Sequence, residues 1–319
     1  MKVLVIGGSG FIGGRLIEVL SRAGHEVTDF DLRPPTGAHG ETVIGDITDA
    51  EAVSRAAAGQ DVIVNLAAEH RDDVRPSSRY DLVNVDGSAN VIAAAAAHGV
   101  RQLVFTSSVA IYGLDAADPD EEVPAAPFND YGRTKLAAER LYRDWAAADP
   151  ERGLLIVRPC VVFGEGNRGN VYNLIKQIAG GRFVRVGDGT NRKSMAYVGN
   201  VVQFLAGRLP VAPGVTVFNY ADKPDLTTKE LVGVVEQAVG SRRLALPAIP
   251  LWMGLAAGSV IDGIARLTRR TFPVSRIRIR KFAADTQVNA DAAHATGFRA
   301  QTSLPEALRR TIATEFPKR

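Results

Sequence analysis

The chain begins with a short apolar run that leads directly into a glycine-rich loop, and this combination constrains the fold more than any other feature. Residues 3–6 are Val-Leu-Val-Ile, and a helix-like stretch follows the loop over residues 13–23. Glycines at such a turn let the backbone approach a phosphate, which the first amide groups of the helix can bind. The pattern predicts the first strand, turn and helix of a dinucleotide-binding fold. The expected cofactor contacts in the loop are Gly7, Gly10, Phe11, Ile12 and Gly13.

Further along, apolar runs alternate with stretches rich in alanine and leucine. The expected strands cover residues 3–6, 26–30, 42–44, 62–66, 103–106, 154–157 and 215–220, and the expected helices cover 13–23, 50–58, 80–98 and 131–148. Repeated strand–helix units favour a parallel sheet with helices on both faces, because their crossovers are right-handed. We therefore predict an α/β protein with a Rossmann-type doubly wound parallel sheet.

The length of the chain predicts a second, smaller lobe. A chain of 319 residues exceeds what one compact core usually holds. After about Gly164 the glycine content rises and the regular alternation fades. We expect a dinucleotide-binding domain over residues 1–165, which also receives residues 196–221, and a C-terminal substrate-binding lobe over residues 166–319.

Charge and cysteine content exclude several classes of protein. A net charge of +3 with mostly dispersed cations argues against a nucleic-acid partner. The single cysteine, Cys160, indicates a reducing compartment, and the five histidines lack the spacing with cysteine that zinc sites need. The first apolar run is too short for a signal peptide. We expect a cytoplasmic, metal-free protein.

Acidic and apolar residues after the expected strands indicate which cofactor binds. Asp31 ends the second strand, where its carboxylate can accept hydrogen bonds from ribose hydroxyls and would repel the extra phosphate of NADP. The sequence therefore favours NAD. Asp46 and Ile47 follow the third strand and are expected near the adenine, although Asp46 is also a typical turn residue. Ala67, after the fourth strand, is a further expected contact.

A tyrosine and a lysine stand four residues apart near the start of one expected helix, so both side chains lie on one face. The Lys135 ammonium is expected to favour the phenolate of Tyr131, which brings its pKa from about 10 towards the value a general base needs. An exposed pair without a chemical role is the alternative. Ser107 and Ser108 follow the strand at 103–106, at the sheet edge where a nicotinamide is expected.

In this order, the glycine loop, the strand-end serines and the Tyr-Lys pair resemble the extended short-chain dehydrogenases, the NAD-dependent epimerase/dehydratase family. The resemblance covers nearly the whole chain. Further matches are Asn65-Leu66-Ala67-Ala68, Asn84-Val85-Asp86-Gly87 and the run from Ser107 to Gly113. The resemblance implies that Ser108 is the catalytic hydroxyl, Tyr131 the general base and acid, and Lys135 the ribose anchor. Ser107 is the alternative to Ser108, and a homodimer is the implied assembly.

The resemblance also limits the reaction. Val109 and Ala110 stand where the family's sugar-nucleotide 4,6-dehydratases carry an acidic pair, so dehydration is disfavoured. Hydride transfer at a sugar carbinol or ketone carbon, of the 4-epimerase or 4-ketoreductase type, needs only Tyr131 and the cofactor. The resemblance implies a nucleotide sugar as substrate, with Arg192 and Lys193 contacting its diphosphate. A solvated hairpin tip is the alternative for these two cations.

Other features leave the substrate open. Val161 and Tyr197 depart from the residues usual in the family's sugar epimerases. The run from Arg158 to Gly166 is also similar to the 3β-hydroxysteroid dehydrogenase branch, which implies an apolar alcohol as the alternative substrate. A non-catalytic NAD sensor is a second alternative, although such proteins usually lose the Tyr-Lys pair.

Apolar residues recur at helical spacing over residues 251–267, but Asp262 and Arg266 make this stretch a poor membrane span. A core-facing or dimer-facing helix is the first interpretation, and a helix on a membrane surface or against a hydrophobic substrate is the second. Peripheral membrane contact therefore stays open. The one cationic cluster is expected to meet a diphosphate or an anionic surface. It comprises Arg266, Arg269, Arg270, Arg276, Arg278, Arg280 and Lys281.

Overall fold

The computed structural model describes the chain except residues 36–39, 72–73, 114–115, 182, 241–245, 269–275, 277–278, 280–282 and 318–319. The chain forms two compact units. The first consists of Met1–Val162, Val198–Ala221 and Val288–Gln301, and the second of Phe163–Tyr197, Asp222–Gln287 and Thr302–Arg319. The return of the chain at Val288–Gln301 is a feature that the sequence interpretation did not include.

A seven-stranded sheet forms the centre of the first unit, and every neighbouring pair of its strands is parallel. The order β10-β6-β5-β4-β1-β2-β3 is that of a Rossmann fold with one added strand, which confirms the predicted fold class. The switch in strand order lies between β1 and β4, where Ile6 pairs with Asn65. The strands are β1 (Lys2–Ile6), β2 (Glu26–Asp31), β3 (Glu41–Ile44), β4 (Val62–Asn65), β5 (Gln102–Thr106), β6 (Gly153–Pro159) and β10 (Gly214–Tyr220).

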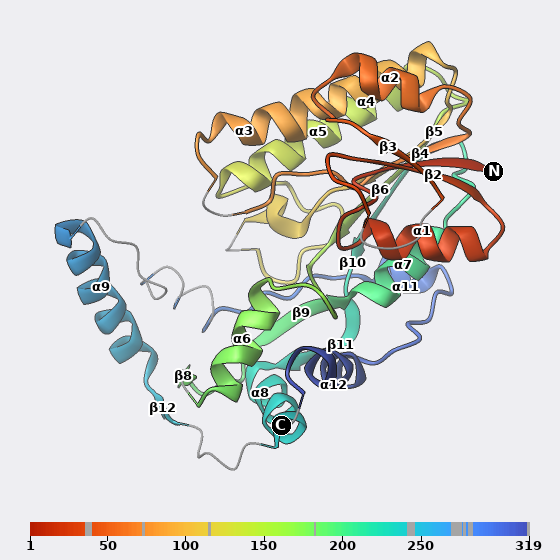
Figure 1. The fold of residues 1–319 in the computed structure, drawn as a ribbon. Coiled ribbons are helices and arrows are strands. Elements are labelled where there is room, and N and C mark those ends of the chain that lie inside the picture. Colours follow the sequence, from red (N-terminus) through yellow and green to blue (C-terminus); the bar gives the residue numbers. More distant parts are fainter. Residues whose placement is uncertain are drawn as a thin grey trace. The chain divides into compact units, whose positions relative to one another are not determined.

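Helices cover both faces of this sheet, as Figure 1 shows. On one face α1 (Gly13–Arg22) packs against α7 (Val198–Ala206), and on the other α4 (Gly87–Ala97) packs between α2 (Ala50–Ala57) and α5 (Asp130–Ala147). Because the central strands are buried on both sides, they appear in the sequence as continuous apolar runs. A short helix, α11 (Asp291–Ala295), packs beside β10.

The expected helix over residues 80–98 is interrupted. The chain forms α3 (Ser78–Asp81), then a π-helical turn, η1 (Leu82–Asp86), before α4 begins at Gly87. Asn84, within this turn, directs its side chain to Glu69 and Thr134. Single π-helical turns of this kind occur frequently at functional sites.

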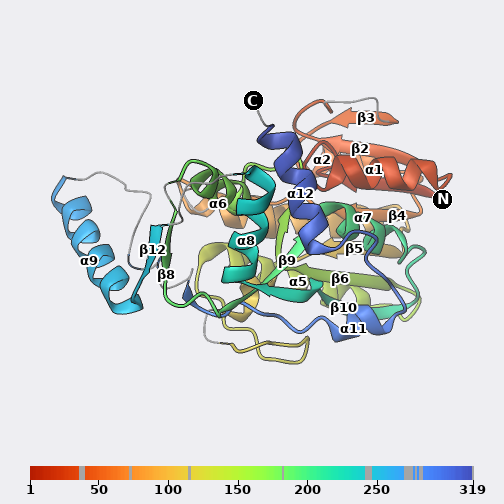
Figure 2. The ribbon, with the colours of Figure 1, turned by 90° about the horizontal axis from the view of Figure 1, so that it is seen from below.

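The second unit is built around smaller sheets. A three-stranded sheet has the order β11 (Asp222–Thr227), β9 (Arg192–Tyr197) and β7 (Val161–Phe163), and β8 (Val184–Val186) pairs in parallel with β12 (Leu246–Ile249). Figure 2 shows α8 (Thr228–Val239) between α6 (Asn170–Ala179) and α12 (Leu304–Glu315), in agreement with the packing contacts.

The remaining helix of this unit is α9 (Leu251–Thr268), which follows β12 directly. Within the described part of the chain, no helix combines the length and the apolar character that crossing a membrane requires. Of the predicted cationic cluster, Arg276 is described and exposed, whereas the side chain of Arg266 and the other five residues lie outside the described residues.

Candidate active site

The glycine loop after β1 has the geometry that a bound dinucleotide requires. Gly7 has a φ of +82°, and a Cβ atom there would lie 2.9 Å from the amide nitrogen of Ala67. A Cβ atom at Gly13 would lie 2.2 Å from the carbonyl oxygen of Gly7, so only glycine lets α1 begin this close to the loop. Ile12 stands at the N-cap of α1 and provides no side-chain acceptor for the first amides. These amides therefore fit a pyrophosphate.

A buried aspartate that the sequence interpretation missed supports the loop from β2. Asp29 is fully buried, and its Oδ2 atom accepts a hydrogen bond of 2.8 Å from the Ser9 hydroxyl. A Cβ atom on Gly8 would lie 2.2 Å from the other carboxylate oxygen. The available signal was a carboxylate between Thr28 and Phe30 in the middle of an expected strand. Asp31, at the end of β2, is half-buried and accepts a hydrogen bond from the Arg33 amide.

The remaining expected cofactor contacts lie around the same end of the sheet but differ in what their side chains do. Asp46 accepts a hydrogen bond of 2.9 Å from the Thr48 amide, as in the turn alternative. Ile47 is 6% exposed and belongs to the hydrophobic core. Phe11 is half-buried, and the Arg15 guanidinium lies 4.8 Å from its ring centroid.

The start of α5 brings a tyrosine hydroxyl against a serine. Asn129 caps the helix by accepting a hydrogen bond of 2.8 Å from the Gly132 amide. A Cβ atom at Gly132 would lie 2.4 Å from the carbonyl oxygen of Ala110, so glycine permits α5 to pack tightly on the segment after β5. There the side chains of Tyr131 and Ser108 form a hydrogen bond. Ser107 is buried, and its amide continues the sheet by donating to Val157, so the contact favours Ser108.

Lys135 lies one helical turn beyond Tyr131 and is almost completely buried, with 2% of its surface exposed. Its Nζ atom donates a hydrogen bond of 2.8 Å to the Thr106 carbonyl oxygen and lies 4.7 Å from the Phe105 ring centroid. Burial lowers the pKa of Lys135 to about 7, and the nearby Glu139 carboxylate opposes this shift. An exposed pair without a chemical role is therefore not what the structure contains.

The expected effect of Lys135 on Tyr131 is not found. Burial raises the pKa of Tyr131 above its ordinary value, and the hydrogen bond with Ser108 opposes the rise. The physical reason is that the Lys135 ammonium donates to the Thr106 carbonyl, so burial and the Ser108 hydrogen bond determine the direction of the Tyr131 pKa shift. The prediction that the lysine lowers this pKa is wrong for the structure described.

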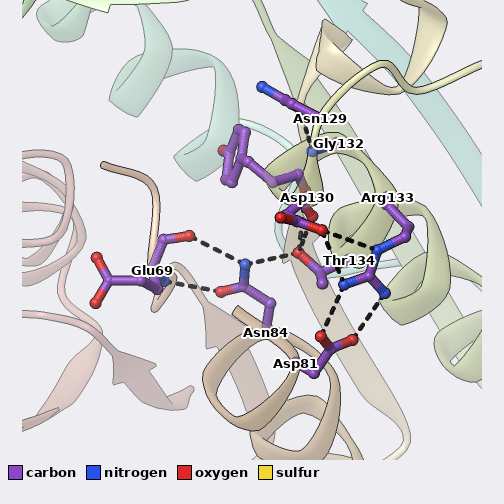
Figure 3. Close-up of polar contacts among 9 residues, drawn as sticks. Glu69, Asp81, Asn84, Asn129, Asp130, Gly132, Arg133 and Thr134 are labelled. Carbon is purple, nitrogen blue, oxygen red and sulfur yellow. Dashed lines mark hydrogen bonds and ion pairs between the residues drawn. The ribbon is translucent and has the colours of Figure 1, made fainter. Parts of the chain in front are cut away.

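A hydrogen-bond network beside Tyr131 joins three segments, as Figure 3 shows. The Asn84 side chain accepts from the Glu69 amide at 2.8 Å, and donates to the Glu69 carbonyl and the Thr134 hydroxyl, both at 3.0 Å. The Arg133 guanidinium binds the Asp81 carboxylate through two hydrogen bonds, of 2.8 and 2.7 Å. The network fixes the first turn of α5 to the π-helical turn and to the segment after β4.

A buried ion pair lies further along α5. Arg158, on β6, donates to both carboxylate oxygens of Glu139, at 2.9 and 2.7 Å. The same guanidinium donates to the Tyr112 hydroxyl at 2.7 Å, and that hydroxyl donates to Asn219 on β10 at 2.8 Å. Sequence reasoning missed this network, because its members are far apart in the chain.

The expected diphosphate contacts belong to the second unit, on β9. The Arg192 guanidinium donates to the Asp225 carbonyl at 3.1 Å, and the Lys193 ammonium donates to the Ala284 carbonyl at 2.6 Å. Burial lowers the pKa of Lys193 to about 8. Both residues begin a strand that pairs with β11, where Arg192 is exposed and Lys193 is half-buried. Tyr197, at the end of β9, donates its hydroxyl proton to the Glu165 carboxylate.

Strand order, the cofactor loop and the contact between Tyr131 and Ser108 define a dehydrogenase of the short-chain type. Within that class the chain belongs to the NAD dependent epimerase/dehydratase family, whose model matches residues 3–209. This confirms the resemblance, the enzymatic assignment and the dependence on NAD.

Two relatives and one solved structure show which members of the family the chain is similar to. The chain is 48% identical over 317 residues to N-acetyl-alpha-D-glucosaminyl-diphospho-ditrans,octacis-undecaprenol 4-epimerase of Escherichia coli O157:H7, covering 99% of this chain and 95% of that protein. It is 34% identical to 3-beta-hydroxysteroid dehydrogenase of Mycolicibacterium neoaurum, covering 67% of this chain and 63% of that protein. Among solved structures it resembles MoeE5 in complex with UDP-glucose and NAD, with a TM-score of 0.77, 27% identity and 98% of each chain covered.

Proposed function

We propose that this enzyme inverts the 4-hydroxyl of an N-acetylhexosamine that a diphosphate joins to a long polyprenol. The catalytic part of this proposal rests on the contact between the Tyr131 and Ser108 hydroxyls. Lys135 is buried one helical turn further along α5. The substrate rests on the relative from Escherichia coli, which matches this chain over nearly its whole length. The mode of reaction is the hydride transfer at a sugar carbon that the sequence predicted.

Each proposed role follows from the position of a side chain in the first unit. Ser108 holds the 4-oxygen of the sugar, and Tyr131 removes the proton of that hydroxyl and later returns it. Lys135 binds the nicotinamide ribose. Residues Gly7 to Gly13 would hold NAD, with Asp31 at its adenine ribose, and the bound NAD would supply a reversible hydride acceptor.

Return of the hydride to the opposite face of the sugar ring makes the reaction an epimerisation. The substrate and the product then have the same mass, and no reductant is consumed. A ketoreductase with the same residues would instead consume NADH in proportion to product. The absence of an acidic pair at Val109 and Ala110 supports a reaction without elimination of water.

The second unit is proposed to bind the rest of the substrate, with Arg192 and Lys193 as contacts for the diphosphate. Guanidinium and ammonium groups are the usual protein partners of phosphate oxygens. Both side chains are held by backbone carbonyls of their own unit, which supports a fixed orientation. We propose further that the enzyme acts as a homodimer, as the family resemblance implies, and that it works in the cytoplasm, as its single cysteine indicates.

The substrate can be identified by supplying three compounds to the purified protein with NAD. These are N-acetylglucosaminyl-diphospho-undecaprenol in detergent, UDP-N-acetylglucosamine and a 3β-hydroxysteroid, and the products are analysed by mass spectrometry and NMR. We expect the polyprenyl compound to give a C4-inverted product of unchanged mass, and the Tyr131→Phe variant to give none. Reduction with consumption of NADH, or oxidation of the steroid alone, would overturn the proposal.

A further inference from the structure

The outward side of α9 is apolar, which is unusual for a helix at the surface of a protein. Trp252 is 70% exposed, Val260 is 63% exposed and Met253 is 43% exposed. Ala256 and Ala257 are exposed between them, and residues 251–261 contain no charged side chain. We refer to Trp252, Met253, Ala256, Ala257 and Val260 as the α9 face.

The opposite side of α9 is already packed. A Cβ atom on Gly254 would lie 2.6 Å from a methyl group of Val186, and one on Gly258 would lie 2.8 Å from the Cα atom of Arg276. The inner side therefore includes two glycines that allow close approach, while Trp252, Met253 and Val260 point outward. A helix that stabilised only its own fold would show the reverse arrangement. Contiguous exposed apolar side chains of this kind mark an interaction surface.

The charge of the neighbouring sequence indicates which partner fits. Residues 262–281 contain seven cations and one carboxylate, a net charge of +6, whereas the whole chain carries +3, so all other residues together carry −3. The positive charge of the protein is thus concentrated directly after the α9 face. An apolar helix face followed in the sequence by a strongly basic segment matches a surface that is apolar inside and anionic outside.

We propose that the α9 face inserts into the interfacial region of an anionic phospholipid bilayer, and that the basic sequence after it makes the protein prefer anionic lipid. A second copy of this chain fits less well, because two copies would bring two segments of +6 together. The inference deepens the proposed function and rests on it for its purpose, since a polyprenol substrate is itself held in a membrane. Binding to the bilayer can nevertheless be measured without any substrate.

The two tryptophans of the chain make the test direct. Trp145 is 5% exposed and Trp252 is 70% exposed, so only Trp252 can move from water into lipid. We expect the emission of the full-length protein to shift to shorter wavelength on addition of vesicles made of phosphatidylcholine and phosphatidylglycerol in equal parts. The protein should also sediment with these vesicles, and much less with vesicles of phosphatidylcholine alone or at high salt.

A double variant on the α9 face and a matched control complete the experiment. Trp252→Ser with Val260→Ser should weaken vesicle binding by about tenfold or more, because each side chain loses the burial of its apolar surface. Val215→Ser, which changes a valine on β10 that is 42% exposed, should leave binding unchanged. Equal binding by the double variant and the wild type would overturn the proposal. Self-association that depends on Trp252 without any vesicle binding would overturn it as well.

Two further substrates distinguish a failure of the proposed function from a failure of membrane binding. A water-soluble analogue, with a short prenyl chain on the same diphospho-sugar, should be epimerised equally by the wild type and by the double variant. The vesicle-embedded substrate should be epimerised about tenfold more slowly by the double variant. If the wild type binds vesicles but converts neither substrate, the proposed function fails and the docking surface stands. If the double variant converts the embedded substrate as fast as the wild type, the docking surface has no role in catalysis and the inference fails.

Discussion

Helices α5 and α9 are both 18 residues long, but α5 buries charged side chains whereas α9 exposes large apolar ones. On α5, the charged side chains of Lys135 and Glu139 are 2% and 1% exposed. On α9, Trp252 and Val260 are mostly exposed. Charged residues are rarely buried without a partner, and large apolar residues rarely gather on a free surface. Each helix thus carries residues that its own folding does not favour.

The two exceptions differ in how the protein compensates for them. Burial of charge on α5 is balanced inside the first unit, because Glu139 binds Arg158 and the Lys135 ammonium binds a carbonyl oxygen. Among the described residues, no contact covers Trp252, Met253 or Val260 on α9 in the same way, and we have proposed that a lipid surface does so. The difference fits the two proposals, in which α5 serves the chemistry and α9 serves an external surface.

The largest effect is expected from removing the hydroxyl that the α5 helix presents to Ser108. Tyr131→Phe should lower kcat by about 10³-fold, because a positioned acid–base group contributes about that much, while NAD binding is retained. Steady-state turnover and a NAD binding titration measure the two quantities. Tyr172→Phe, on α6, is the control and should be fully active. Unchanged turnover in Tyr131→Phe would remove the phenol from the mechanism.

Next in size is the loss of the buried carboxylate of α5. Glu139→Gln should lower the free energy of unfolding by about 3 kcal/mol, because the Arg158 guanidinium is left buried without its counter-charge. The control is Glu306→Gln, which breaks the exposed Arg310–Glu306 pair on α12 and should leave the free energy of unfolding almost unchanged. Urea denaturation measures both. If both substitutions lowered the free energy of unfolding equally, burial would not explain the stabilising effect of the Arg158–Glu139 pair.

Replacement of the buried lysine should stabilise the protein, with a defined dependence on pH. The pKa of Lys135 falls from 10.5 to about 7 on folding, so between these values the unfolded chain binds more protons and stability rises with pH. Lys135→Met removes this dependence. The variant should be more stable by about 1–3 kcal/mol below pH 7, and the gain should vanish as the pH approaches 10.5. A gain independent of pH would contradict the burial of an ionisable group.

The smallest effect is expected on the other helix. Trp252→Ser should change the free energy of unfolding by less than about 0.5 kcal/mol, because an exposed side chain contributes little to the fold. Thermal denaturation in the absence of lipid is sufficient to measure it. A loss several times larger would mean that Trp252 packs within the protein, and the contrast between α5 and α9 would then disappear.

Local patterns were sufficient to predict most of the first unit. The strand expected at 26–30 is β2 (Glu26–Asp31), and the helix expected at 131–148 is α5 (Asp130–Ala147). Buried parallel strands and alanine-rich helices have strong periodic signals. The glycine loop was equally predictable, because its spacing and its position between strand and helix are both local.

The supporting network of the site could not be predicted in the same way. Tyr112 and Asn219, which share a hydrogen bond, are 107 residues apart, and Asn84 is 50 residues from Thr134. The π-helical turn at η1 has no periodic signal, since it depends on these distant partners. The pKa of Tyr131 was wrongly predicted for a related reason: spacing places Lys135 beside it but does not show where the ammonium points.

The central claim is that hydride leaves the sugar carbon and returns to the same carbon, with Tyr131 exchanging only the hydroxyl proton. The most direct measurement is to run the reaction of the polyprenyl diphospho-sugar in deuterated water and to examine C4 of the product by NMR. Our account predicts inverted configuration with the original hydrogen kept at C4 and no deuterium from the solvent. Solvent deuterium at that carbon would contradict it, because the carbon would then have lost a proton instead of a hydride.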